Sequence, residues 1–298
     1  MRKGSRTPAM RDLGSLCGFG ISLCTLAILT TPAWGGLVDY NTPGDLVGNF
    51  SLNHAGAGVR YSEVGVGGIG GSGSIAPSNA IDAVHTTALY DQESFDFSVA
   101  GSSVTVSQFV FRQNDASFPF EFSFQQLGIL QSTGDRFGVD SGPDSYVSLR
   151  VMSDTIANTG VFLQTEVRGS ADVSRSQQTI PGETANLVEG NWYRMWATFE
   201  NVSSTQVRIT GALEDWGTTA GGFQSTVLAL TAGDAESLVD VSGLSGTTVL
   251  SDGDVWAGWR GFGEGGANLF DNFGAVPEPA SLILFVLGAG SLVCRKRF

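Results

Sequence analysis

Residues that commonly carry enzyme chemistry are scarce in this chain of 298 residues. It contains three cysteines, and Cys17, Cys24 and Cys294 all lie close to one terminus or the other. The stretch 36–275 therefore has no cysteine, which excludes disulfides, thiolate metal sites and cysteine nucleophiles from it. At about 240 residues, this stretch is long enough to be stabilised by a hydrophobic core of its own.

Histidines and common catalytic motifs are equally scarce. His54 and His85 are the two histidines, and both lie in polar, loop-like surroundings. We interpret them as structural or surface residues; no G-x-S-x-G motif accompanies them, but a Ser-His-Asp triad needs one histidine and stays open. Gly65–Ser74 is rich in glycine but lacks the Lys-Ser/Thr pair that would contact phosphates, so we interpret it as a loop or hairpin.

Lysine is absent from residues 36–275, since Lys3 and Lys296 are the two lysines of the chain. Nine arginines stand against 27 acidic residues in this stretch, which gives it a net charge of −18. Such a domain is repelled by nucleic acid and by anionic lipid, so neither is an expected partner. We interpret the acidity as a source of solubility outside the cell.

The N-terminus has the three parts of a secretory signal peptide. Four basic residues, Arg2, Lys3, Arg6 and Arg11, precede an apolar stretch from Leu13 to Leu29. Ala33 and Gly35 then place small residues at the −3 and −1 positions of a cleavage site. The sequence predicts a signal helix within residues 1–35, cleavage after Gly35 and export through the inner membrane.

The C-terminus combines a rigid triplet, a short apolar run and a basic end. Val276, Pro277, Glu278 and Pro279 precede an apolar segment at about 280–294, and Arg295, Lys296 and Arg297 follow. As a helix this segment rises about 22 Å, somewhat less than the hydrocarbon core of a bilayer, and the basic end should stay inside. The alternative is a plain membrane anchor.

These three parts, in this order, resemble the PEP-CTERM sorting tail of exported bacterial proteins. The resemblance implies that residues 276–298 hold the protein in the inner membrane until an exosortase-type transpeptidase cuts near the motif. The domain would then reach the cell surface or the medium. Proteins with this tail accompany exopolysaccharide production, so the resemblance also favours a surface or matrix role.

Residues between the two targeting segments alternate like strands of antiparallel sheets. Short runs have apolar residues at every second position and end at glycine, serine, asparagine or aspartate. They are Val104–Arg112, Phe118–Phe124, Tyr146–Met152, Gly160–Arg168, Trp192–Phe199 and Gln206–Leu213. Because no amphipathic helix of useful length accompanies them, the sequence predicts an all-β sandwich over residues 36–275.

Several of these segments resemble laminin-G and concanavalin A-like jelly rolls. Glu189–Phe199 is similar to the Trp-Tyr-Arg strand of those folds, and Gly263–Gly274 is similar to their closing strand. Gly65–Gly73 and Gly101–Phe111 also fit a pattern found in exported PEP-CTERM proteins. The resemblance implies two curved antiparallel sheets, of which the concave one often binds carbohydrate.

Polar residues opposite the predicted core face are the candidate ligand-binding residues. Trp196 could stack on the C–H face of a sugar while arginine, glutamine and glutamate bind hydroxyls; an ordinary solvated sheet face is the alternative. The candidate set is Arg112, Glu121, Gln125, Arg150, Gln164, Glu166, Arg168, Arg194 and Trp196.

Asp271 and Asn272 are the candidate metal ligands. Calcium takes carboxylate, amide and carbonyl oxygens, and jelly rolls of this kind often hold one structural calcium. An early loop near Asp39 or Asp45 could complete the site, because first and last strands commonly lie side by side. The alternative is an aspartate that caps a turn, with no cofactor at all.

Two functional classes remain open at this point. A jelly-roll glucanase would carry an E-x-D-x-x-E strand whose carboxylates flank the glycosidic bond, whereas the phenylalanine-rich run offers Glu121 followed by Ser123 and Gln125. We therefore predict a non-catalytic surface or matrix protein with polysaccharide as its partner. A secreted glycoside hydrolase, or another carbohydrate-active enzyme of jelly-roll fold, with dispersed carboxylates is the alternative.

Overall fold

The computed structural model describes the backbone of residues 36–54, 61–77, 86–112, 125–138, 143–153, 160–172, 175–180, 185–261 and 268–278. They all belong to one compact unit, Ala33–Phe298. The predicted signal helix within residues 1–35, the predicted transmembrane helix at about 280–294 and the run Phe118–Phe124 lie outside the described residues. No helix in the described ranges has the length and apolar character needed to cross a membrane.

One sheet is built around a long central strand, and we call it the β12 sheet. Its strands pair antiparallel in the order β14-β13-β12-β7-β17-β4-β3, while β1 pairs with β17 and β15 pairs with β13. Their bounds are β1 Gly36–Val38, β3 Tyr61–Val64, β4 Ser74–Pro77, β7 Ser103–Arg112, β12 Trp192–Ser203, β13 Gln206–Asp215, β14 Ser225–Leu230, β15 Leu238–Asp240 and β17 Asn268–Glu278.

The second sheet, which we call the β10 sheet, is also antiparallel. Its order is β11-β10-β9-β8-β16-β5-β2, and β6 pairs with β16. The bounds are β2 Phe50–His54, β5 Thr86–Tyr90, β6 Phe95–Asp96, β8 Gln125–Leu130, β9 Tyr146–Ser153, β10 Val161–Arg168, β11 Ser176–Thr179 and β16 Asp254–Gly261. Helix α1, Asp45–Asn49, and two 3₁₀ turns, Ile69–Gly71 and Ala235–Ser237, complete the described elements.

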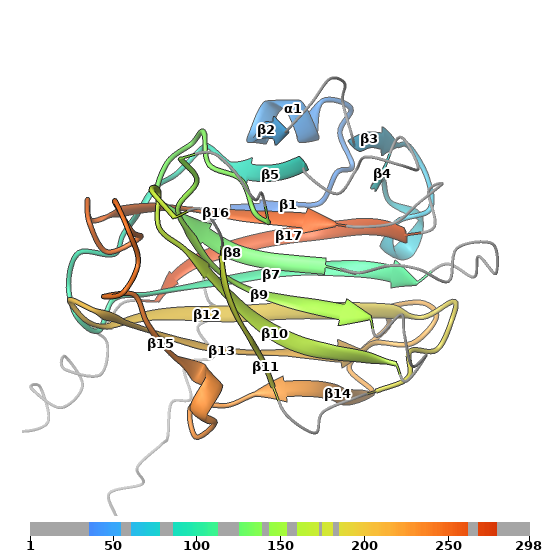
Figure 1. The fold of residues 1–298 in the computed structure, drawn as a ribbon. Coiled ribbons are helices and arrows are strands. Elements are labelled where there is room, and N and C mark those ends of the chain that lie inside the picture. The colour runs from blue at the N-terminus through green and yellow to red at the C-terminus, as the bar shows by residue number, and fades with distance from the viewer. Residues whose placement is uncertain are drawn as a thin grey trace, which may run out of the picture. The chain divides into compact units, whose positions relative to one another are not determined.

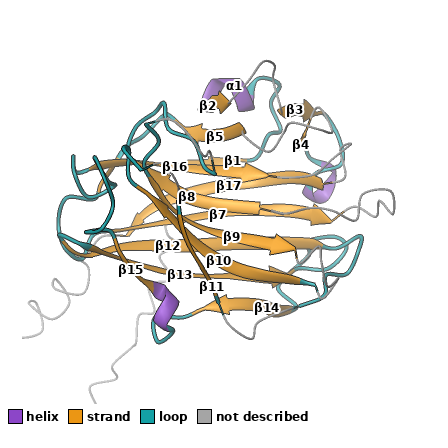
Figure 2. Ribbon diagram, viewed as in Figure 1, coloured by secondary structure: helices purple, strands orange, loops and turns teal. Residues whose placement is uncertain are grey.

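The two sheets face each other and share one hydrophobic core (Figure 1). Strands β8, β9 and β10 contact β12, β13 and β14 across that core. Figure 2 shows how little helix accompanies the strands. The predicted all-β sandwich of two antiparallel sheets is therefore confirmed for the described part of the chain.

Strand β12 shows why the sequence pattern predicts the sandwich. Tyr193, Met195, Ala197 and Phe199 are buried in the core, while the alternate residues Arg194–Glu200 are partly exposed on the outer face. Successive side chains in a strand point to opposite faces, so one face packs and the other meets water. The predicted core face of this strand is confirmed.

Strand β10 differs, because both of its faces are buried. Its predicted apolar residues, Val161, Leu163 and Val167, belong to the core as expected. Its opposite face carries Glu166, which is also fully buried. The outer face of β10 around Glu166 is thus not solvated, and the charges there must be stabilised by one another.

Candidate functional site

The predicted ligand-binding residues fall into two groups on different sheets. Arg150, Gln164, Glu166 and Arg168 lie on β9 and β10, whereas Arg194 and Trp196 lie on β12. Gln125 points into the core, where its amide donates a 2.9 Å hydrogen bond to Gln108 of β7. Glu121 and the side chain of Arg112 lie outside the described residues. The structure therefore presents two candidate sites instead of one.

The first group forms a buried arginine–glutamate cluster on the outer face of the β10 sheet. We define it as Gln126, Arg150, Gln164, Glu166, Arg175 and Arg260. Glu166 accepts hydrogen bonds from Gln126 Nε2 at 2.7 Å and from Gln177 Nε2 at 3.1 Å. It also forms ion pairs with Arg175 and, at 3.4 Å, with Arg150. One carboxylate thus holds two guanidinium groups and two amides.

Further hydrogen bonds fix the arginines of this cluster. Arg150 Nε donates to Gln164 Oε1 at 2.7 Å, and Gln164 Nε2 donates to Thr179 Oγ1 at 2.9 Å. Arg260 Nη1 donates to Phe137 O at 3.2 Å and approaches Gln126 Oε1 at 3.5 Å. Burial lowers the pKa of both Arg150 and Arg260, and Glu166 opposes that shift. The cluster is a linked network held away from water.

Gly138 covers one side of the cluster. Its φ is +67°, and a Cβ placed there would lie 1.9 Å from Arg260 Nη1. Its carbonyl oxygen accepts a 2.7 Å hydrogen bond from Arg175 Nη1. Only glycine fits this conformation and this approach, so the loop and the two arginines fix one another.

The cluster lacks the pair of acids that glycosidic hydrolysis requires. Glu166 is the only carboxylate among its described members, and four donors already contact it. Burial raises the pKa of the neighbouring Tyr146 well above its usual value, so that phenol is poorly suited to act as a base. The described members of the cluster thus provide no pair of carboxyl groups, and their burial fits a structural role in the β10 sheet.

The second group forms a half-exposed aromatic face on the outer side of the β12 sheet. We define the aromatic face as Phe109, Phe111, Trp192, Trp196 and Trp216, with Arg194 and Glu214 between the rings. Phe109 and Trp216 meet edge to face with ring centroids 5.1 Å apart, and Phe111 and Trp192 lie 5.3 Å apart. All of these rings except Trp192 are partly exposed.

Glu214 organises this face. Its two carboxylate oxygens accept hydrogen bonds from the indole N–H of Trp196 at 2.9 Å and of Trp216 at 3.1 Å. Arg194 lies 3.7 Å from the same carboxylate, and burial lowers the pKa of its guanidinium. Two indole rings are thus oriented in advance beside a charged pair, which is an arrangement that suits stacking against a sugar ring.

The sequence reasoning missed several members of both groups. Gln126 lies one position after the predicted Gln125, and Arg260 lies in β16, which was not predicted as a strand. Trp216 follows the end of β13, where alternation no longer indicates a face. Glu214 lies on the same face of β13 as Thr210 and Ala212, because alternate residues share a face. Since Ala212 pairs with Trp196, this alternation places Glu214 on the same face as that indole.

Asp271, the candidate calcium ligand, is fully buried where the pairing of β17 with β7 shifts register. Its carboxylate accepts hydrogen bonds from Ile69 N at 2.8 Å, Ser72 Oγ at 2.9 Å and Asn272 N at 2.8 Å. Burial raises the pKa of Asp271, and Asp39, one of the two early carboxylates, is near enough for its negative charge to raise it further. Asp39 accepts from Asn41 Nδ2 at 2.7 Å. Asp45 instead accepts from Thr42 N. Donors surround Asp271, so its described neighbours do not form the oxygen shell that calcium takes. The carboxylate ties the glycine-rich loop to the closing strand.

Asp271 should make the stability of the fold depend on pH. Burial raises its pKa to about 6, so the folded protein binds a proton that the unfolded chain has already released. The free energy of unfolding should therefore fall as the pH rises from about 4 to about 6. Asp271→Asn should reduce this slope in chemical denaturation, and Asp254→Asn, at an exposed position of β16, should leave it unchanged. Equal slopes in all three proteins would contradict this role.

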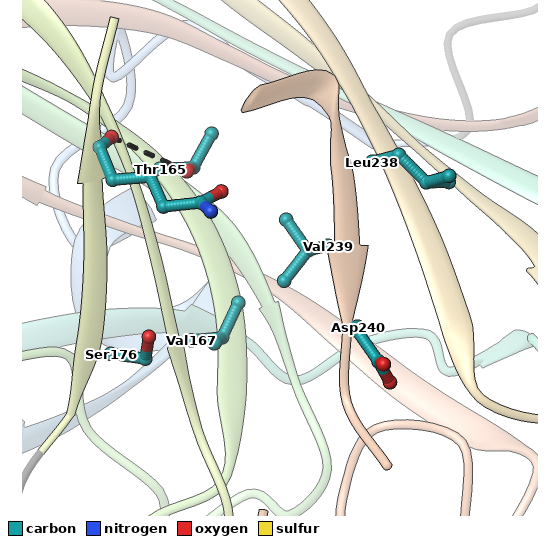
Figure 3. Close-up of a pocket in the computed structure, with 7 residues that line it drawn as sticks. Thr165, Val167, Ser176, Leu238, Val239 and Asp240 are labelled. Carbon is teal, nitrogen blue, oxygen red and sulfur yellow. Dashed lines mark hydrogen bonds between the residues drawn. The ribbon is translucent and has the colours of Figure 1, made fainter. Parts of the chain in front are cut away.

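One small cavity of about 170 Å³ lies between the two sheets at their edge (Figure 3). Val167 of β10 and Val239 of β15 line it from opposite sides, and Thr165, Ser176, Gln178, Leu238 and Asp240 complete it. Among the described residues that line it, Asp240 is the one carboxylate. These residues thus offer no acid–base pair.

The described residues contain neither a histidine side chain nor a cluster of metal ligands. His54 ends β2, and its side chain and all of His85 lie outside the described residues. No group of three or more histidine, cysteine, aspartate or glutamate side chains is placed to hold a metal ion in the part of the chain that the structure describes.

Comparison with known proteins gives a motif and an architecture. Residues 275–297 match the PEP-CTERM protein-sorting motif, and no curated protein matches the chain. The PL-14 alginate lyase from Aplysia kurodai is 11% identical, with a TM-score of 0.48 over 80% of this chain and 95% of that chain. Lectin I-B4 from Griffonia simplicifolia, in its metal-free form, is 10% identical, with a TM-score of 0.44 over 80% and 98%. Such similarities concern the strand arrangement alone. This chain therefore carries a PEP-CTERM sorting motif whose first residues lie in the last strand of a β-sandwich.

Proposed function

We propose that this protein is an exported, non-catalytic surface or matrix protein that binds polysaccharide through the aromatic face. The observation that supports binding is the pair of indoles held by Glu214 beside Arg194. Ring faces stack on the apolar C–H side of a pyranose, while the neighbouring charged groups bind its hydroxyls. Partly exposed aromatic residues that gather on one sheet face commonly mark a binding surface.

The position of the sorting motif supports the same proposal. Strand β7 pairs with the motif at Ser103, whereas Phe111 of the aromatic face lies eight residues further along that strand. At about 3.3 Å per residue this separation is roughly 26 Å. If the C-terminal tail holds the protein at the inner membrane before an exosortase-type enzyme cuts it, the aromatic face extends from Trp196, whose partner Ser107 is four residues from Ser103, to Phe111 at the end away from that attachment.

The alternative of a secreted glycoside hydrolase receives less support. The arginine–glutamate cluster has one described carboxylate, and the aromatic face has Glu214, whose oxygens are already bonded to two indoles. Hydrolysis needs one carboxyl as acid and a second as base or nucleophile, at most about 10 Å apart. The proposed protein should therefore bind its polysaccharide without releasing product.

The test is binding of the full chain, purified in detergent, to neutral and acidic polysaccharides. Trp196→Ala and Trp216→Ala should each weaken binding by roughly tenfold or more, as expected for a buried aromatic anchor in an interface. Phe162→Ala, which removes a half-buried ring from the β10 sheet, is the matched control and should bind normally. Trp196→Phe should keep part of the affinity because a ring remains.

Three results would contradict the proposal. Unchanged affinity in both tryptophan variants, with each shown to be folded by circular dichroism, would remove the aromatic face as the binding site. Release of reducing or unsaturated ends from the bound polymer would show an enzyme. Absence of binding to any polymer on the panel would leave a passive structural role.

A further inference from the structure

The sorting motif begins inside a strand of the folded domain. Residues 275–278 at the end of β17 pair in register with residues 106–103 of β7. Val276 is only 7% exposed, and the preceding Ala275 is fully buried. The matched motif spans residues 275–297, so its first residues are also part of the β12 sheet. The domain boundary predicted after residue 275 thus falls within a continuous strand.

Almost no chain separates this strand from the predicted membrane segment. Pro279 is the one residue between Glu278, the last residue of β17, and Ala280, where the apolar run begins. One residue spans at most about 3.6 Å even when fully extended. The motif is therefore not presented on a flexible spacer while β17 is paired along its whole length.

The end of β17 is held less firmly than its middle. Strand β1 pairs with β17 from Phe273 to Ala275, so that stretch has a neighbour on each side. Beyond Ala275, β7 is the only strand that pairs with β17 among the described residues. Pro277 also lacks a backbone N–H to donate. This end can detach without disturbing the doubly paired part, as the least protected segments of folded proteins do.

From this arrangement we infer that Val276–Glu278 is a masked recognition segment, bound in turn by β7 and by the extended-peptide groove of the processing enzyme. The inference rests on the proposed sorting function. A groove that binds an extended peptide forms hydrogen bonds with a backbone edge of the peptide and takes its alternate side chains into pockets. In the folded domain β7 occupies one backbone edge of the segment and the Val276 side chain is buried, whereas Pro277 is exposed. Processing therefore requires that this segment leave the sheet.

A reversible crosslink between β7 and the segment tests this requirement. Thr105 and Val276 are cross-strand partners, and residues 36–278 contain no cysteine that could interfere. In the full-length Thr105→Cys/Val276→Cys precursor, in membranes that contain the processing enzyme, oxidation should abolish cleavage. A thiol reductant should restore it, which also controls for loss of the Thr105 hydroxyl that bonds Thr198.

The matched control is a crosslink between the same two strands, two residues further from the motif. Ser107 and Gly274 are partners on the same face of the same two strands, two residues away. The oxidised Ser107→Cys/Gly274→Cys precursor should be cleaved as fast as its reduced form, because Val276–Glu278 stays free to detach. A gel that separates precursor from product, sampled over time, measures all four states.

The outcomes separate the masking inference from the sorting proposal. Cleavage of the oxidised Thr105→Cys/Val276→Cys precursor at the rate of the oxidised control would overturn masking, because the enzyme would then accept the paired strand. A triple change of Pro277, Glu278 and Pro279 to alanine addresses the sorting proposal itself. If that variant is processed like the unchanged chain, the motif does not direct processing, and both ideas fail.

Discussion

Glu166→Ala should lower the free energy of unfolding by about 3–5 kcal/mol, as does removal of one partner from a buried ion pair. The side chain of Glu166 is fully buried, and that of Arg150 is 4% exposed. Without the carboxylate, Arg150 loses an ion-pair partner, and Gln126 loses the acceptor of its 2.7 Å hydrogen bond. Water cannot easily replace the lost carboxylate as a partner for either group, so the folded state is destabilised.

The matched control for this prediction is Glu200→Ala on the β12 sheet. Glu200 also pairs with an arginine, Arg208, at 2.7 Å, but both side chains are about one-third exposed. Its removal should cost at most about 1 kcal/mol. Urea denaturation of the two variants measures the difference directly. Equal effects would mean that the arginine–glutamate cluster is reached by water and is not a buried network. Glu166→Gln separates charge from hydrogen bonding, because it keeps an acceptor without the charge.

Trp259→Ala should cost about 3–5 kcal/mol, the usual range when a large aromatic side chain is removed from a core. Trp259 is fully buried in β16 between the sheets. Its ring centroid lies 4.7 Å from that of Tyr61, 5.3 Å from that of Phe270 and 6.3 Å from that of Phe50. These partners come from three other strands, so the cavity would loosen both sheets at once.

Trp256→Ala is the control for core packing, because Trp256 lies three residues earlier on the opposite face of the same strand and is partly exposed. It should lose clearly less stability than Trp259→Ala. The midpoint of denaturant unfolding compares the two. A larger loss for Trp256→Ala would show that the main packing of β16 lies on its outer side.

Alternation predicted the fold well where one face meets water and the other meets the core. Strand β12 is the clear case, because Tyr193, Met195, Ala197 and Phe199 are buried and the alternate residues from Arg194 to Glu200 are partly exposed. Strand β16 was not predicted. Its inward residues, Val255, Ala257 and Trp259, are separated by Trp256 and Gly258, which give no polar contrast. Buried strands of this kind show little period in sequence.

The candidate sites were harder to predict than the fold, because they depend on which sheet each strand joins. Arg150 and Trp196 were placed on one surface, but β9 and β12 belong to opposite layers. Alternation gives the face of a residue within its own strand and says nothing of the partner sheet. The contacts of Arg260 with Phe137 and Gln126 join segments more than 100 residues apart, which local spacing cannot reveal.

The pairing of β7 with β17 also determines how the domain would respond to a mechanical load. A polymer bound at the Phe111 end of the aromatic face and a tail held at the membrane beyond Glu278 would pull along the length of these strands. In that geometry the cross-strand hydrogen bonds from Asn268 to Glu278 share the force in shear instead of breaking one after another. The protein would then be suited to resist tension between a cell and its surrounding polymer.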